Sequence, residues 1–361
     1  MRIRDTAEWV ALAGAAALLV FAGRAFAAAY LAPPAPIDVH VRAPPAPPNP
    51  KIWEEGEMQA LALSWHDGLA CWREADGAVR VTHTAADSAP GKITTFRLAG
   101  AVVGPVPVAG ADEACWFASN TLRCASPASD RVVDVATAAN SVVEMAADAR
   151  GVVWTQFDGV VAEVTRGVGK AGTVRTLAKL RYPDHVVLDG DTAYVVTLGP
   201  LRIVRVARGD AQQQTLFERA GVNHAGLLLA DRDALYLDMY DRHDAMGRIL
   251  RIAKRDGAVT TLYEGFAHVA LATIHGDTLY AVSAPETDEG QWDLDHAAVV
   301  TLPARGGPIS RVRLPAENDH GSTDLVIGWG GSIALTNDSI LFTRAPRNPV
   351  GAPGPIWQLE E

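Results

Sequence analysis

The sequence predicts an all-β fold, a seven-bladed β-propeller that occupies residues 51–361. One unit recurs along this region, and its clearest copies begin DGDTAYVV (189–196), DRDALYLD (231–238) and HGDTLYAV (275–282). Each copy continues with a β-branched strand and then a more polar strand. Four short strands repeated about every 40–50 residues are typical of a propeller blade.

An aromatic residue marks the second strand of each predicted blade. Its first five intervals along the chain are 38 to 44 residues, whereas the sixth is 62 residues, because residues 284–297 and 315–329 resemble two inserted loops. We interpret these aromatic residues as core side chains that pack between neighbouring blades. They are Trp72, Trp116, Trp154, Tyr194, Tyr236, Tyr280 and Phe342.

The two ends of the propeller region are expected to pair with each other. Residues 356–360 match the third strand of a blade, so the last blade lacks a fourth strand. Residues 51–55 resemble a fourth strand such as 262–265. Pairing of 51–55 with 356–360 would complete the ring and remove two open sheet edges that invite aggregation.

The segment before the propeller region contains an N-terminal hydrophobic helix in our prediction. Residues 9–23 are apolar, and the apolar run continues to residue 31 after Arg24. One interpretation of residues 1–31 is a secretory signal peptide cleaved after Ala27. The other is an uncleaved membrane anchor, which the proline-rich, extended spacer 32–50 favours. Both predict a periplasmic or cell-surface propeller.

Two of the three cysteines are expected to form a disulfide bond. If Ser119 and Asn120 form a two-residue turn, Cys115 faces Cys124 at a non-hydrogen-bonded pair, where side chains lie closest. That geometry suits a disulfide bond, and the alternative is a pair of separate reduced cysteines. Cys71 has no partner in its own blade and is expected to be a buried apolar residue.

The charge pattern excludes one class of function, and the motifs favour no standard enzyme. The formal net charge is −10, and the chain lacks the Lys/Arg clusters that follow a phosphate backbone, which excludes nucleic acid as a partner. Nucleophile elbows, zinc-protease motifs, phosphate-binding loops and dinucleotide fingerprints are missing from the sequence.

Histidine recurs near the first strand of three successive blades. His185, His224 and His268 precede their aromatic residues by 9, 12 and 12 positions. Because first strands line the central channel of a propeller, the three imidazoles are expected to converge at its mouth, where they would suit Zn, Mn or Fe. His320 would then serve as a fourth ligand or a catalytic general base. The alternative is that duplication copied a structural histidine.

The inserted loops are the second candidate site. Residues 286–296 are acidic and contain Trp292, which predicts a partner-binding loop, with a Ca²⁺ site or a plain solvated loop as the alternatives. Trp329 either stacks on a ligand at the channel mouth or caps a blade edge.

The repeat is clearest over residues 184–314. It runs as Asp-Gly-x-x-x-Tyr, then a Gly-x-Ile-x-Arg-Val strand, then a Thr-Leu strand. This pattern resembles bacterial propellers of the NHL-like and TolB-like kind. The resemblance implies a fold, and the superfamily includes binders, scaffolds, lyases and hydrolases, so it selects no activity. We expect an exported module, tethered to the membrane or secreted, that binds a protein or cell-envelope ligand or serves as a scaffold subunit. The alternative is a metal-dependent lyase or hydrolase.

Overall fold

The computed structural model of the chain divides it into two compact units, residues 1–40 and 41–361. All residues that the structure describes belong to the second unit. The described ranges are 51–54, 60–66, 69–74, 79–83, 94–96, 107–110, 113–126, 128, 131–165, 172–222, 225–241, 246–265, 268–284, 298–311, 324–325, 333–335, 339–345 and 356–360.

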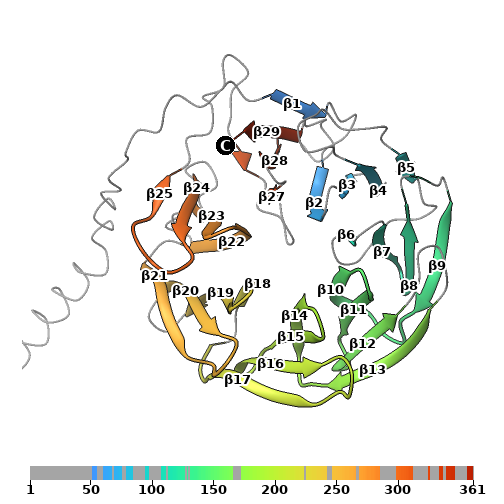
Figure 1. Cartoon of the computed structure of the whole chain (residues 1–361), viewed down its shortest axis with the longest axis horizontal. Helices are drawn as coiled ribbons and strands as arrows, with labels where there is room; N and C mark the ends of the chain where they lie inside the picture. The colour runs from blue at the N-terminus through green and yellow to red at the C-terminus, as the bar shows by residue number, and fades with distance from the viewer. Residues whose placement is uncertain are drawn as a thin grey trace, which may run out of the picture. The chain divides into compact units, whose positions relative to one another are not determined.

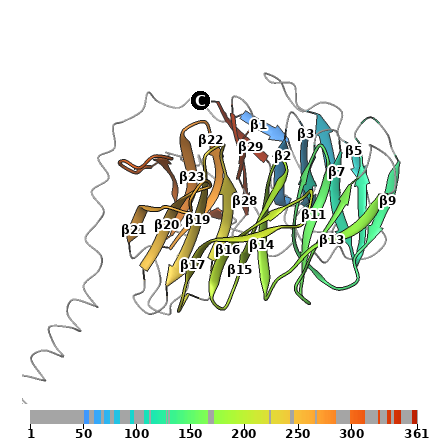
Figure 2. The same cartoon turned by 60° about the horizontal axis from the view of Figure 1, so that its bottom comes forward.

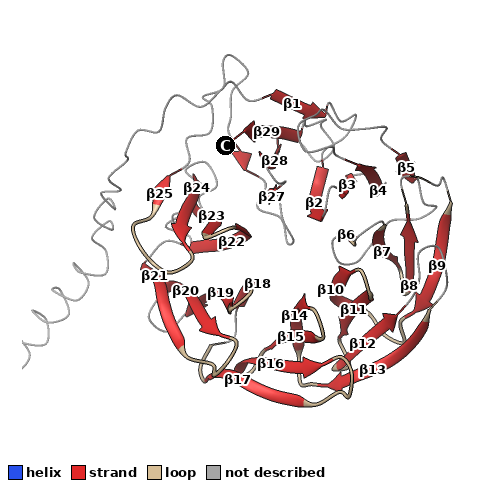
Figure 3. Ribbon diagram, in the orientation of Figure 1, coloured by secondary structure: helices blue, strands red, loops and turns tan. Residues whose placement is uncertain are grey.

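The described residues are strands and loops (Figure 3), and the strands form antiparallel sheets of four in chain order. The repeat of a turn, an aromatic strand and two β-branched or polar strands therefore folds as predicted. The first three sheets contain β2 (Ala60–His66), β3 (Leu69–Glu74), β4 (Val79–His83) and β5 (Thr94–Phe96); β6 (Val108–Ala109), β7 (Ala114–Ala118), β8 (Thr121–Ala125) and β9 (Val132–Thr137); and β10 (Val142–Asp148), β11 (Gly151–Gln156), β12 (Val160–Thr165) and β13 (Thr173–Lys179).

The next three sheets follow the same order. They contain β14 (Pro183–Asp189), β15 (Thr192–Thr197), β16 (Leu201–Ala207) and β17 (Gln213–Arg219); β18 (Ala225–Ala230), β19 (Ala234–Asp241), β20 (Met246–Ala253) and β21 (Val259–Gly265); and β22 (His268–His275), β23 (Thr278–Ala284), β24 (Ala298–Pro303) and β25 (Ser310–Arg311). We name each sheet by its first strand.

The last sheet joins the two ends of the propeller region. It contains β26 (Asp324–Leu325), β27 (Ile333–Leu335), β28 (Ser339–Ala345), β29 (Ile356–Glu360) and the early strand β1 (Lys51–Glu54). β1 pairs antiparallel with β29, with Ile52 opposite Trp357. The pairing that the sequence predicted between these two segments is therefore present.

The sheets follow one another around a central axis (Figure 1). The first strand of each sheet lies nearest this axis, and in the last sheet this innermost strand is β27. Each innermost strand contacts that of the next sheet, in the order β2, β6, β10, β14, β18, β22 and β27, and β27 contacts β2. A view turned by 60° shows the strands of neighbouring sheets running side by side (Figure 2). The described part of the chain is thus all-β and has the arrangement of a propeller.

The core lies between the sheets, where the aromatic second-strand residues pack. Six of the seven predicted aromatic residues are at most 6% exposed, from Trp72 to Tyr280. Phe342 lies in β28, but its side chain is outside the described residues. Phe117 adds an edge-to-face contact with Trp154 of the next sheet, their ring centroids 5.7 Å apart. The aromatic positions are therefore structural, as the sequence indicated.

The β7–β8 hairpin has the predicted register and disulfide bond. Cys115 lies opposite Cys124, and Ser119 and Asn120 form the turn. The two sulfur atoms are bonded, and the two Cα atoms are 4.1 Å apart. Cys71 is reduced and buried. The prediction for all three cysteines is confirmed.

The alternating strand directions place each loop at one of two edges of the ring. We call the edge where successive sheets connect, and where second and third strands turn, the connection edge. The opposite edge, with the turns between first and second strands and between third and fourth strands, is the turn edge.

The predicted signal peptide or anchor (1–31) and the linker (32–50) lie outside the described residues. Among those described, no helix has the length and hydropathy to cross a membrane.

Candidate functional site

His185 lies in β14 near the connection edge, in a pocket of carboxylates. Its Nδ1 is 3.8 Å from Oε2 of Glu144 in the neighbouring β10 sheet, and its Nε2 is 3.6 Å from Oδ2 of Asp184. Both distances exceed hydrogen-bond length. The strands hold these groups together, because the Thr155 hydroxyl donates to the carbonyl of Asp184 and receives the backbone N–H of Glu144.

The carboxylates determine the charge of His185. Burial by itself would lower the imidazole pKa, but Glu144, Asp184 and Asp238 together outweigh burial and raise it. We therefore interpret His185 as a bridge between the β10 and β14 sheets whose protonated form is favoured by the surrounding carboxylates.

Asp238 extends this cluster to a third sheet. It lies in β19, is 5% exposed, and packs against Gly226, where an added Cβ would lie 1.9 Å from Oδ2 of the carboxylate. Burial raises the Asp238 pKa to about 7, although His185 and backbone N–H groups lower it in part. A glycine at position 226 is required because a side chain there would displace the carboxylate.

Two of the three predicted histidines, His185 and His268, lie at different register positions on their strands. His185 precedes Val187, the partner of the aromatic Tyr194, by two residues. His268 precedes Thr273, the partner of Tyr280, by five residues. Three residues along a strand correspond to about 10 Å. This offset follows from the spacings of 9 and 12 residues in the sequence, because the strand partner of each aromatic residue lies seven positions before it.

The described residues give the metal hypothesis no support. Glu144 and Asp184 face different ring nitrogens of His185, so they do not share one coordination site with it. Within the described ranges, one group has metal-ligand spacing, Glu113 with Cys115 and Cys124, and both of its sulfur atoms are in the disulfide bond. His224, His320, Trp292, Trp329 and the side chain of His268 lie outside the described residues.

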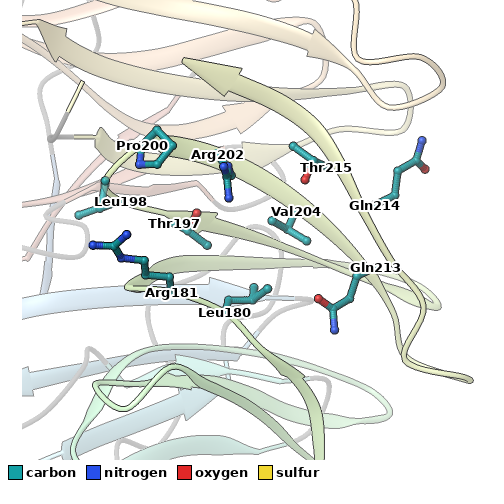
Figure 4. A pocket seen from close by; sticks show the side chains of 11 residues that line it. Leu180, Arg181, Thr197, Leu198, Pro200, Arg202, Val204, Gln213, Gln214 and Thr215 are labelled. Carbon is teal, nitrogen blue, oxygen red and sulfur yellow. The ribbon is translucent and has the colours of Figure 1, made fainter. Parts of the chain in front are cut away.

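A groove of about 290 Å³ opens between the β10 and β14 sheets, at the connection edge (Figure 4). One wall is formed by Leu180 and Arg181, in the connection between β13 and β14, and the other by β15, β16, β17 and the turn between β15 and β16. The turn between β15 and β16 contains a cis bond between Gly199 and Pro200. The residues that line the groove are Leu180, Arg181, Thr197, Leu198, Gly199, Pro200, Arg202, Val204, Gln213, Gln214 and Thr215.

The groove is rich in hydrogen-bond donors. Its lining includes two arginines, two glutamines and two threonines but no aspartate or glutamate, although the whole chain is acidic. Arg202 donates from Nη2 to Glu218 of β17 at 3.0 Å, whereas its buried Nε makes no hydrogen bond. Arg181 is exposed, with its guanidinium 5.1 Å from the centroid of the Tyr182 ring. The groove therefore suits an anionic ligand.

Two exposed aromatic residues lie beside the groove. Phe157 is 72% exposed and Tyr182 is 59% exposed. Backbone bonds fix both loops, because Leu180 donates to Gly159 at 2.8 Å and Leu198 donates to Tyr182 at 3.0 Å. Tyr182 also has φ of 48°, a value that side-chain-bearing residues seldom adopt. Exposed aromatic residues next to arginine are typical of contact surfaces between proteins.

Comparisons with known proteins support the fold and leave the family open. No family model and no curated protein matches the sequence. The chain is similar to one chain of an S. cerevisiae complex in which Dbp5 is bound to Nup159, Gle1, IP6 and ADP (TM-score 0.52, 10% identity, covering 86% of this chain and 94% of that chain).

Two further solved structures are similar. They are the N-terminal domain of Nup159 (TM-score 0.51, 10% identity, 86% and 94% covered) and a protein of unknown function from Desulfotomaculum acetoxidans (TM-score 0.51, 9% identity, 76% and 88% covered). These neighbours include propeller proteins, and at such low identity they show the fold alone. The predicted relation to NHL-like or TolB-like families has no support from sequence comparison.

Proposed function

We propose that this chain is a closed seven-bladed propeller that acts as a protein-binding scaffold. The pairing of β1 with β29 and the cyclic contacts of the first strands support seven blades in a closed ring. The observation that carries the function is the groove between the β10 and β14 sheets, with its donor-rich lining and its flanking aromatic residues.

The proposed location is outside the cytoplasm, with the chain tethered by its N-terminal segment or secreted. The disulfide bond between Cys115 and Cys124 supports this, because such bonds persist mainly in oxidising compartments. The apolar run in residues 9–31 and the proline-rich residues 32–50 are the sequence features that favour a tether.

The partner that fits the groove is a protein segment with acidic side chains. Arg181 and Arg202 offer charge-assisted hydrogen bonds to carboxylates, and the apolar side chains of Leu180, Leu198 and Pro200 cover the stems of such residues. Phe157 and Tyr182 would then serve as anchors at the rim. One structural neighbour comes from an assembly in which Dbp5 is bound to Nup159, which accords with a scaffold function for this fold.

A capture experiment with the full chain tests the groove. Wild type and an R181E/Y182A variant are incubated with solubilised envelope proteins, and the bound proteins are identified by mass spectrometry. V259A is the matched control, because Val259 is exposed on an outer strand of another sheet. We expect wild type and V259A to retain the same partner and R181E/Y182A to lose it. Equal capture by all three would contradict the assignment of the groove.

The two inserted loops that the sequence predicts, 284–297 and 315–331, are the second part of the proposed surface, and most of their residues lie outside the described part of the chain. The second loop contains β26, which pairs with β28. Replacing residues 285–297, 315–323 and 326–331 with short turns, and keeping β26, should abolish capture without unfolding the ring. Unchanged capture would exclude the loops and leave the groove as the binding surface.

A further inference from the structure

A buried cation ties the β14 sheet to the β10 sheet at the turn edge. Arg208 begins the turn after β16 and is 0% exposed. Its Nε donates to Glu163 at 2.7 Å and its Nη2 to Asp148 at 3.3 Å, while Nη1 donates to Asp148 and to the carbonyl of Gly190. Both carboxylates belong to the preceding sheet. The turn residue therefore acts as an inter-sheet clamp.

The next junction repeats the clamp with a lysine. Lys254 begins the turn after β20, and its Nζ donates to Asp189 of the preceding sheet at 2.6 Å. Nζ also donates to the carbonyl of Asp231 in its own sheet, and it lies 5.4 Å from the centroid of the Tyr194 ring. A carboxylate and an aromatic face thus hold one ammonium group.

The third junction lacks this side chain. The backbone N–H groups of Arg208, Lys254 and Ala304 donate to equivalent carbonyls of their own sheets, at 2.8, 3.0 and 2.7 Å. The acceptors are Asp191, Asp233 and Asp277. Ala304 is therefore the structural counterpart of the two cations, and its methyl group cannot reach the preceding sheet.

A cleft of about 810 Å³ lies where the third cation would be. Its lining includes Ala304 together with Asp231 and Tyr236, which correspond to the Asp189 and Tyr194 that hold Lys254. Among the described residues, no cationic side chain forms an ion pair with Asp231. The cleft therefore offers the Asp231 carboxylate without the side chain that fills the equivalent position elsewhere. The Tyr236 ring is 1% exposed, and its hydroxyl contributes by bonding to Asp231.

Asp231 is ionised and fixed in place. Burial would raise its pKa, but hydrogen bonds from the Tyr236 hydroxyl and from the N–H groups of Ala234 and Asp233, with the charge of Lys254, lower it overall. The hydroxyl bond is 2.6 Å, and the backbone bonds are 2.6 and 2.7 Å. An ionised carboxylate at a pocket wall attracts a cation without having to move.

The cleft favours an ammonium over a guanidinium. Arg208 binds two carboxylates, Asp148 and Glu163. In the sheet that begins with β18, Ile252 occupies the register position that Glu163 has in the sheet that begins with β10. The cleft beside Ala304 therefore lacks the second carboxylate that binds Arg208. The lysine junction has the same tyrosine and a single aspartate, which makes Lys254 the better template.

Arg251 lines the cleft and its side chain interacts with the Tyr236 hydroxyl, but an arginine at the equivalent position does not prevent cation binding at the lysine junction. Arg251 lies opposite Tyr236 as Arg205 lies opposite Tyr194, and Lys254 binds Asp189 in the presence of Arg205. The other charges of the lining are the exposed Arg232, Asp233, Asp277 and Arg305, which balance one another.

We propose that this cleft binds an alkylammonium group, and that the group is a lysine side chain of the partner protein. The identity of the carrier rests on the proposed function, whereas the ammonium specificity follows from the junctions alone. The partner's lysine would fill the position that Arg208 and Lys254 fill at the other two junctions.

The test titrates the full chain with Nα-acetyl-lysine methylamide, followed by ligand-observed NMR. The norleucine counterpart, which lacks the ammonium group, is the control ligand. We expect saturable binding of the lysine compound and none of the norleucine compound. Absence of saturable lysine binding would overturn the proposal. Partner capture through the groove is measured separately, so failure of either experiment leaves the other interpretable.

Three variants locate the site. A304K fills the cleft from within, D231N removes the charge but keeps the backbone-capping oxygen, and A304S leaves the cleft open. A304K and D231N should each weaken lysine binding by about tenfold or more, with A304S close to wild type. If A304K does not fold, D231N decides. Unchanged binding in D231N would overturn the site, and n-butylammonium binding as tight as the lysine compound would overturn the peptide origin of the ligand.

Discussion

The three described junctions at the turn edge differ in the residue that begins the turn after the third strand. Between the β10 and β14 sheets the position is Arg208, between the β14 and β18 sheets it is Lys254, and between the β18 and β22 sheets it is Ala304. The first two junctions contain ion pairs that cross from sheet to sheet. The third contains a polar cleft, in which the Tyr236 hydroxyl bonds to Asp231.

At the first two junctions the cation stabilises the contact between sheets, whereas at the third junction the cleft stays open to a ligand. A cation supplied by the chain neutralises the carboxylate of the preceding sheet and fills the space beside it. Where alanine replaces the cation, the carboxylate stays charged and accessible. A repeat protein can thus convert one of several equivalent junctions into a ligand site by removing a single side chain.

Removal of the arginine clamp should have the largest effect. R208M leaves Asp148 without its cation, whereas the buried Glu163 keeps an ion pair with Arg175. Loss of one partner of a buried ion pair costs about 3–5 kcal/mol of unfolding free energy, and because Arg175 still pairs with Glu163 we expect a loss of about 3 kcal/mol. Urea unfolding should show this as a lower midpoint. The double variant R208M/E163Q should recover part of the loss, and wild-type stability of R208M would contradict the clamp.

Removal of the lysine clamp should cost less. In K254M the stranded carboxylate is Asp189, whose side chain is 47% exposed, so water replaces much of the lost interaction. We expect a loss of about 1 kcal/mol, measured by the same urea titration. A loss as large as that of R208M would show that burial of the carboxylate does not set the difference between the two junctions.

The carboxylate beside His185 should make stability fall as pH rises. The Asp238 pKa of about 7 lies above the usual 3.8, so its protonated form favours the folded state. This contribution is complete below about pH 4 and is lost as pH rises through 7. His185, with its raised pKa, acts in the same direction near and above pH 6.5.

Thermal unfolding of D238N between pH 5 and pH 8 tests this sign. Asparagine does not ionise, so the variant should lose less melting temperature over this range than wild type. D256N is the matched control, because Asp256 is exposed and its pKa is lowered, which puts its titration below the range. Parallel pH profiles for wild type and D238N would contradict the ionisation of Asp238 near neutrality.

The sequence predicted the features that depend on contacts between residues close together in the chain. The turn and the aromatic second strand identify each sheet, and the hairpin from Cys115 to Cys124 fixes its own register. The histidines were harder to place, because their spacings of 9 and 12 residues from the aromatic residue put His185 and His268 at different register positions on their strands.

The clamps and the groove depend on neighbouring sheets and could not be read from one repeat. The segments ARGD (207–210), AKRD (253–256) and PARG (303–306) do align, and the alignment would have singled out the change from cation to alanine. It would not have shown that the cation reaches the preceding sheet, because that contact joins residues 45 or more positions apart.

The most direct test of the comparison is a double-mutant cycle at the third junction. Unfolding free energies are measured for wild type, A304K, D231N and A304K/D231N. If position 304 is the counterpart of Lys254, the new lysine should stabilise the chain by about 0.5 kcal/mol, and only while Asp231 is present. Additive effects of the two substitutions, with no coupling between them, would contradict the account.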